Sequence, residues 1–181
     1  MRTFINLVIT ASVILVFPSC SQHTNKWAPY SDAAFTDSMP EKPLVYDKAN
    51  ELTPFGKQNV HYVSWKPQTL ELNKFKLFQV SYTDCPGRYT SDSIQTNATL
   101  DSSINLRKRD FTDLEVVSEP ISINGYPGRA FIYNPDKDNV VTIVKEVIAD
   151  HKRFDLTVIA KRDYPTNAEI NKFFNSFKIL R

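Results

Sequence analysis

Hydrophobic and polar residues alternate most regularly in the second half of the chain, where they predict an antiparallel meander. The segments 129–133, 140–149 and 154–162 are the expected strands, and the links between them are short enough for hairpins. In the last strand, every second residue from Phe154 to Ala160 is apolar, and polar residues take most positions between them. This alternation is typical of a sheet with one buried face.

The end of the chain carries the clearest helix pattern. Thr166 and Glu169 form a T-x-x-E capping box, and an apolar stripe follows at positions i, i+3, i+4 and i+7. The stripe consists of Ile170, Phe173, Phe174 and Phe177. Its natural cover is the apolar face of the meander, and a surface that binds a partner is the alternative interpretation.

The first half of the domain predicts further strands and one more helix. The expected elements are strands at 59–63, 70–82, 114–118 and 121–123 and a helix at 91–109. The alternation flips its phase near Leu77, which predicts a β-bulge there. Together the elements predict an α+β fold in which helices pack on an antiparallel β-sheet.

The first twenty residues have the pattern of a bacterial lipoprotein signal. Arg2 precedes an uncharged run from residue 4 to residue 17, and Cys20 follows shortly after. At ~1.5 Å rise per residue, this run spans only about two thirds of a ~30 Å hydrocarbon core, which favours a cleaved signal over a membrane-spanning helix. Cys20 is then the lipid-accepting residue. Cleavage near Ser19 without lipid and an uncleaved anchor are the alternatives.

A lipid on Cys20 would hold the mature chain on the outer side of a membrane in the bacterial cell envelope. Ser21, and not Asp, follows the cysteine, which favours the periplasmic side of the outer membrane in a Gram-negative cell. Residues 21–54 are polar and show no hydrophobic period, so they predict a disordered, flexible linker. The expected organisation is a signal peptide at 1–20, the linker at 21–54 and one domain at 55–181. The single aromatic residues of the linker could alternatively pack onto the domain.

The composition excludes several classes of function. The net charge of +2 falls to +1 when Arg2 leaves with the signal, which gives no electrostatic reason to expect nucleic acid as a partner. With Cys20 assigned to lipid, Cys85 has no disulfide partner and is expected to be a small buried residue. The sequence shows no zinc-site spacing and no nucleotide-binding or hydrolase motif. We therefore expect no metal, no cofactor and no catalytic residue, and an enzyme is the least favoured class.

Four short motifs resemble the layout of the PsbP/Mog1-like proteins. They are SYTD at 81–84, GYPGR at 125–129, RFDL at 153–156 and FFNSFK at 173–178. The likeness covers roughly residues 55 to 181 and implies an antiparallel sheet between helices, an α/β/α sandwich. It also implies roles in binding or assembly, in a superfamily that includes uncharacterised bacterial lipoproteins. No metal-binding residue of the photosystem proteins in this superfamily matches a residue of this sequence.

These patterns favour a membrane-anchored, non-catalytic binding or assembly factor. The alternative is a small-molecule or lipid carrier that uses a cavity between sheet and helix. A protein partner in the envelope is expected to contact Tyr126 and Arg129 in one turn and Arg88 and Tyr89 nearby, because aromatic and Arg side chains are enriched in such contacts. Ser38, in an Asp-Ser-Met triplet of the expected linker, resembles an O-glycosylation acceptor.

Overall fold

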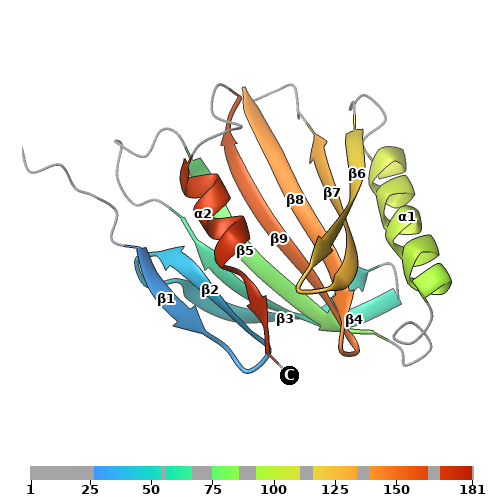
Figure 1. Cartoon of the computed structure of the whole chain (residues 1–181), viewed down its shortest axis with the longest axis horizontal. Coiled ribbons are helices and arrows are strands. Elements are labelled where there is room, and N and C mark those ends of the chain that lie inside the picture. Colours follow the sequence, from blue (N-terminus) through green and yellow to red (C-terminus); the bar gives the residue numbers. More distant parts are fainter. Residues whose placement is uncertain are drawn as a thin grey trace, which may run out of the picture.

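The computed structural model describes residues 27–53, 56–66, 75–85, 93–110, 116–133, 139–162 and 168–180. These residues form ten strands and two helices (Figure 1). The strands are β1 (Trp27–Ser31), β2 (Phe35–Pro40), β3 (Leu44–Thr53), β4 (Gly56–Trp65), β5 (Phe75–Asp84), β6 (Val116–Ile123), β7 (Tyr126–Tyr133), β8 (Val140–Ala149), β9 (Lys152–Lys161) and β10 (Lys178–Ile179). The helices are α1 (Ser93–Asp110) and α2 (Ala168–Ser176).

A seven-stranded antiparallel sheet forms the centre of the molecule. Its strand order is β3-β4-β5-β9-β8-β7-β6, so β3 and β6 lie at the two edges. The predicted strands at 59–63, 140–149 and 154–162 are confirmed within β4, β8 and β9. The predicted bulge is confirmed as well, as a register shift between Phe75 and Leu77 where β5 pairs with β9. Because successive side chains of a strand point to opposite faces of the sheet, one face of the central strands is more apolar than the other.

One face of this sheet carries the main hydrophobic core. Helix α2 and a small sheet of order β1-β2-β10 cover it (Figure 1). Phe173 of α2 lies 5.4 Å from Phe78 between ring centroids, and Phe177, just after the helix, lies 5.5 Å from Phe35 of β2. The expected burial of the phenylalanine stripe is confirmed. Its cover includes β2, β4 and β5 in addition to the meander.

Helix α1 lies on the opposite face, over β7 and β8 (Figure 1). Its buried positions fall at helical spacing and are mostly hydroxyl-bearing: Thr96, Thr99, Leu100, Ser103 and Ile104. Leu100 packs with Cys85 and Ile148, whereas Ile104 packs with Phe131 and Val144. Two small apolar clusters and a set of polar contacts thus hold α1, and the rest of this sheet face carries both polar and apolar side chains.

The expected fold class, an α+β sandwich of a sheet packed with helices, is wrong. The described residues are mostly β-strand, and a three-stranded sheet does much of the covering that helices were expected to do. The expected disordered linker is also wrong for residues 27–53, which form β1, β2 and β3. Every second residue of β2 is buried, namely Phe35, Asp37 and Met39. Because Asp37 is polar, the sequence of β2 does not show the alternation of apolar and polar residues that predicts a strand.

Two other differences have simple causes. The expected short strands at 114–118 and 121–123 form one strand, β6, which contains Pro120. An edge strand tolerates proline because one side of its backbone needs no ladder partner. The signal sequence, Cys20 and the start of the linker lie outside the described residues. Within the described segments, neither helix has the length and apolar character needed to cross a membrane.

Candidate ligand-binding groove

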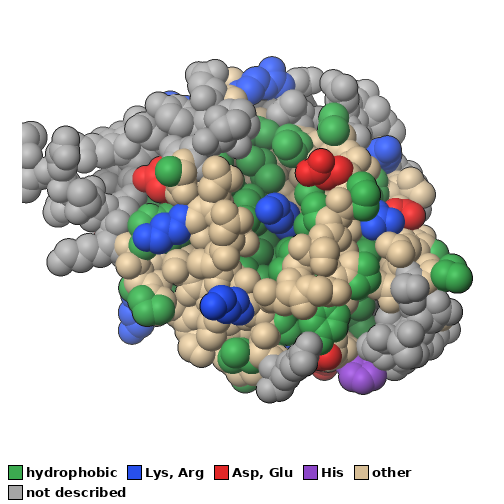
Figure 2. Space-filling view, in the orientation of Figure 1, with side chains coloured by type: hydrophobic (Ala, Val, Ile, Leu, Met, Phe, Trp, Pro, Cys, Tyr) green, Lys and Arg blue, Asp and Glu red, His purple; other side chains and the backbone are tan. Residues whose placement is uncertain are grey.

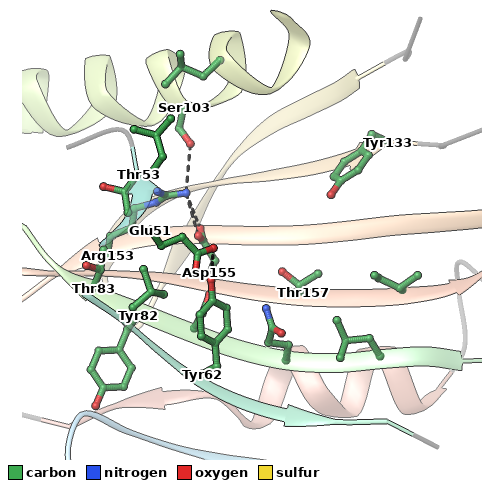
Figure 3. A pocket seen from close by; sticks show the side chains of 17 residues that line it. Glu51, Thr53, Tyr62, Tyr82, Thr83, Ser103, Tyr133, Arg153, Asp155 and Thr157 are labelled. Atoms are coloured by element: carbon green, nitrogen blue, oxygen red, sulfur yellow. Dashed lines mark hydrogen bonds and ion pairs between the residues drawn. The ribbon is translucent and has the colours of Figure 1, made fainter. Parts of the chain in front are cut away.

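An open groove of about 420 Å³ lies on the α1 face of the large sheet (Figure 3). Its floor is formed by β4, β5 and β9, and its walls come from β3 on one side and from α1 and β7 on the other. Pockets of about 300–1,000 Å³ are typical of small-ligand sites. The lining includes Glu51, Leu52, Tyr62, Leu77, Gln79, Ser81, Thr83, Ser103, Leu106, Tyr133, Arg153, Asp155, Thr157 and Ile159.

The period of two in the central strands explains why the groove is polar. On β5, the apolar residues Phe78 and Val80 face the core, so Gln79 and Ser81 face the groove. On β9, the same alternation directs Asp155 into the groove. From their alternation alone, these polar positions are typical of a sheet side that faces solvent. Their place on central strands was the signal that could have revealed the groove, because neighbouring elements cover central strands more often than edge strands.

A buried ion pair fixes the α1 end of the groove. Arg153 Nε lies 2.9 Å from Glu146 Oε1, and Arg153 Nη2 lies 2.9 Å from Asp155 Oδ2. The hydroxyl of Ser103 on α1 donates to Glu146 Oε2 at 2.8 Å. Burial alone would lower the pKa of Arg153, but the two carboxylates outweigh burial and raise it, so the guanidinium stays charged.

Glu51 of β3 and Tyr62 of the neighbouring strand β4 form the β3 side of the groove. The Tyr62 hydroxyl donates to Glu51 Oε1 at 2.6 Å (Figure 3). Burial raises the pKa of Tyr62, and the nearby carboxylates of Glu51 and Asp155 raise it further. The Tyr62 ring also stacks on Tyr46 of β3, with 5.0 Å between centroids. This side of the groove therefore combines an aromatic face with the carboxylate of Glu51.

Carboxylates outnumber cations in this groove. Among its described lining residues, Glu51 and Asp155 are acidic and only Arg153 is basic. Arg153 is already neutralised by the buried Glu146 beneath it. The described acidic and histidine side chains do not converge on a point where they could hold a metal ion. The electrostatics of the groove thus favour a ligand with a positive charge.

The sequence-predicted contact residues lie elsewhere. Arg129 reaches α1, with Nε 2.8 Å from Asp101 Oδ1 and Nη1 donating to Asn97 at 3.1 Å, so its guanidinium holds the helix. Tyr126 donates to Asp150 at the end of the β8–β9 hairpin. Arg88 and Tyr89 lie outside the described residues. Contact of these four residues with a partner stays a prediction.

Ser38 and Cys85 have local structural roles. Ser38 lies in β2, where its backbone N–H donates to Ser176 Oγ at 3.0 Å. It is therefore part of a strand and not of the expected linker, and its glycosylation stays a prediction. Cys85 is buried, as expected, and burial raises the pKa of its thiol to about 12.

Asp37 is a buried acid between the small sheet and α2. Its Oδ1 atom accepts hydrogen bonds from the Ser176 hydroxyl and from the backbone N–H of Ser38. Burial raises the pKa of Asp37 to about 7, although both hydrogen bonds oppose the rise. The contact joins β2 to the end of α2.

No protein-family model matches the sequence, and no curated protein matches it. Among solved structures, the chain is similar to the solution structure of cyanobacterial PsbP (CyanoP) from Synechocystis sp. PCC 6803. The TM-score is 0.56 with 12% sequence identity, and the match covers 91% of this chain and 99% of that chain. At this identity the likeness shows the fold alone. The resemblance expected from the sequence motifs is therefore confirmed for the fold, which is PsbP-like.

Proposed function

We propose that the chain is a non-catalytic binding or assembly factor that receives its partner in the groove on the α1 face. The observation that carries this proposal is the groove itself: it is preformed, and buried ion pairs hold its polar floor. A floor fixed before binding loses little side-chain entropy when a ligand arrives. The PsbP-like fold supports an accessory role of this kind.

The chemistry of the groove supports binding rather than catalysis. Arg153 stays charged and paired, so it is a poor base. The Cys85 thiol does not line the groove, and because burial raises its pKa to about 12 it is also a poor nucleophile. A lipid carrier would need a large apolar cavity, whereas hydroxyl, amide and carboxylate groups form much of this lining. These features favour recognition of a polar or charged partner.

We further propose that the domain works in the bacterial cell envelope, anchored by a lipid on Cys20. The pattern of the first twenty residues supports this part of the proposal. A lipid anchor would keep the groove close to a membrane and restrict its partners to the same compartment. Mass spectrometry of the protein from its native membrane fraction tests the anchor: a diacyl or triacyl mass on Cys20 would support it, and an unmodified residue would contradict it.

Site-specific photocrosslinking in the native cell tests the groove. A photoreactive amino acid replaces Leu52, which lines the groove and is exposed, and in a matched control it replaces Val117 on the opposite edge strand. We expect a reproducible crosslinked protein from position 52 and none of that mass from position 117. The same product from both positions, or no product from position 52, would contradict the proposed function.

A further inference from the structure

An ammonium group of the chain itself lies beside the two residues on the β3 side of the groove. Lys48 Nζ lies 5.0 Å from the centroid of the Tyr62 ring and 4.0 Å from Glu51 Oε2. The Lys48 side chain is 56% exposed, so packing does not force it into this place. An aromatic face beside a carboxylate is a favourable environment for an alkylammonium ion. Lys48 therefore shows which chemical group this side of the groove attracts.

Glu51 has capacity left for a further donor. Its Oε1 atom accepts from Tyr62, whereas its Oε2 atom is buried and accepts no hydrogen bond from the described residues. A buried carboxylate oxygen without a donor is costly, and a charged N–H donor would satisfy it best. Lys48, at 4.0 Å, is beyond hydrogen-bond distance. A ligand ammonium that came closer than Lys48 would gain this hydrogen bond.

The position of β3 indicates how such an ammonium would be delivered. In the described part of the large sheet, β3 pairs with β4 and stands at the edge. Leu44, Val45 and Leu52 of this strand are exposed large apolar residues. An extended segment can add to an open sheet edge through its backbone and place alternate side chains on one face. A free amine would use the groove but not the edge.

We propose that the groove recognises a lysine side chain on an extended segment of a partner protein. The ligand ammonium displaces Lys48 from the Tyr62 ring and bonds to Glu51, and the segment lies along β3. This inference rests on the proposed function, because it names the partner chemistry of the same groove.

A titration of the full chain with two matched heptapeptides tests the inference. The probes are acetyl-Val-Thr-Val-Lys-Val-Thr-Val-amide and the same peptide with norleucine, which keeps the four side-chain carbons of lysine and lacks its charged amino group. Binding is followed by NMR chemical shifts of backbone amides. We expect the lysine peptide to bind about tenfold more tightly, as one charge-assisted hydrogen bond allows. Equal affinities would overturn the inference.

Two substitutions separate recognition from a merely structural role. Lys48→Met removes the internal competitor and should tighten binding of the lysine peptide several-fold, whereas Lys178→Met, an exposed lysine on β10, should not change it. Glu51→Gln keeps an acceptor for Tyr62 and should weaken binding about tenfold. The matched control Glu119→Gln lies on the distant edge strand β6. Weaker binding by Lys48→Met, with an unchanged melting temperature, would overturn the inference.

Two further probes test the source of the cation. Spermidine supplies ammonium groups without a backbone, and calcium chloride supplies a cation without an N–H group. We expect neither to compete with the lysine peptide at equal concentration. Full competition by either one would overturn the choice of a protein segment. A crosslinked partner from position 52 without any preference for lysine would leave the proposed function standing and remove only this inference.

Discussion

Arg153 and Glu146 form an ion pair between neighbouring strands that is almost completely shielded from water. Arg153 Nε lies 2.9 Å from Glu146 Oε1, and the side chains are 5% and 0% exposed. Asp155 and Ser103 contact the same guanidinium, so strands β8 and β9 and helix α1 meet at this point. The pair closes one end of the groove and fixes α1 relative to the sheet.

Loss of Glu146 alone should therefore destabilise the fold strongly. Glu146→Gln removes one of the negative charges that balance the buried guanidinium of Arg153. We therefore expect a loss of about 3 kcal/mol in the free energy of unfolding. The double variant Glu146→Leu/Arg153→Met removes both buried charges and should lose less than the single variant. Urea denaturation measures all three proteins. A double variant less stable than Glu146→Gln would contradict this account of the pair.

Asp37 should make the stability depend on pH. The pKa of Asp37 is about 7 in the folded chain and ordinary in the unfolded chain, so folding favours the protonated form. The contribution of Asp37 to stability should be greatest below about pH 4, decline as the pH rises toward about 7, and level off above it, with a total effect on the order of 4 kcal/mol. Urea denaturation at several pH values measures this curve.

Asp37→Asn tests the assignment of that pH dependence. The amide cannot ionise and still accepts from Ser176, so we expect a flatter curve and greater stability than the native chain at about pH 8. Glu41→Gln, at an exposed position near β2, is the matched control and should leave the curve unchanged. An unaltered pH profile in Asp37→Asn would show that another group causes the decline.

Arg129 should help to hold α1 on the sheet. Arg129→Gln removes its ion pair with Asp101, and we expect amide hydrogen exchange in α1 to become faster while exchange in α2 stays the same. The loss in overall stability should be about 1 kcal/mol or less, because Asp101 is more than half exposed. Unchanged exchange in α1 would mean that other contacts suffice to hold the helix.

Cys85 should resist thiol reagents while the chain is folded. Burial raises the pKa of its thiol to about 12, so little thiolate is present near neutral pH. In a Cys20→Ser protein, maleimide labelling of Cys85 should proceed only as fast as global unfolding and should accelerate in urea. Rapid labelling of the native protein would indicate an open path to the cluster with Leu100 and Ile148.

The sequence predicts the strongly periodic elements and misses those with polar residues at buried positions. The stripe of α2 and the alternation of β9 are legible because apolar residues fill the buried positions. Asp37 breaks the pattern of β2, and Thr96, Thr99 and Ser103 give the buried face of α1 a polar appearance. Hydrogen bonds satisfy such residues, and a hydrophobic pattern cannot reveal those bonds.

The groove was not predictable for a related reason. Glu51 and Tyr62 meet across the β3–β4 pair, which begins in a segment without any hydrophobic period. Arg153 and Asp155 look like ordinary exposed residues of an alternating strand, and only the strand order puts them opposite that pair. Figure 2 shows another face of the molecule, where hydrophobic and charged side chains are also mixed. The mixture of side-chain types in the groove therefore does not by itself distinguish the groove from the rest of the surface.

We propose that the partner binds on the α1 face of the large sheet, between β3 and α1. Hydrogen exchange, measured on the chain alone and in complex with its crosslink-identified partner, locates the binding face. We predict protection of amides in β3, β4 and the second half of α1, with no change in β1, β2 and α2. Protection confined to β1, β2 and α2 would place the partner on the opposite face of the sheet and contradict the proposal.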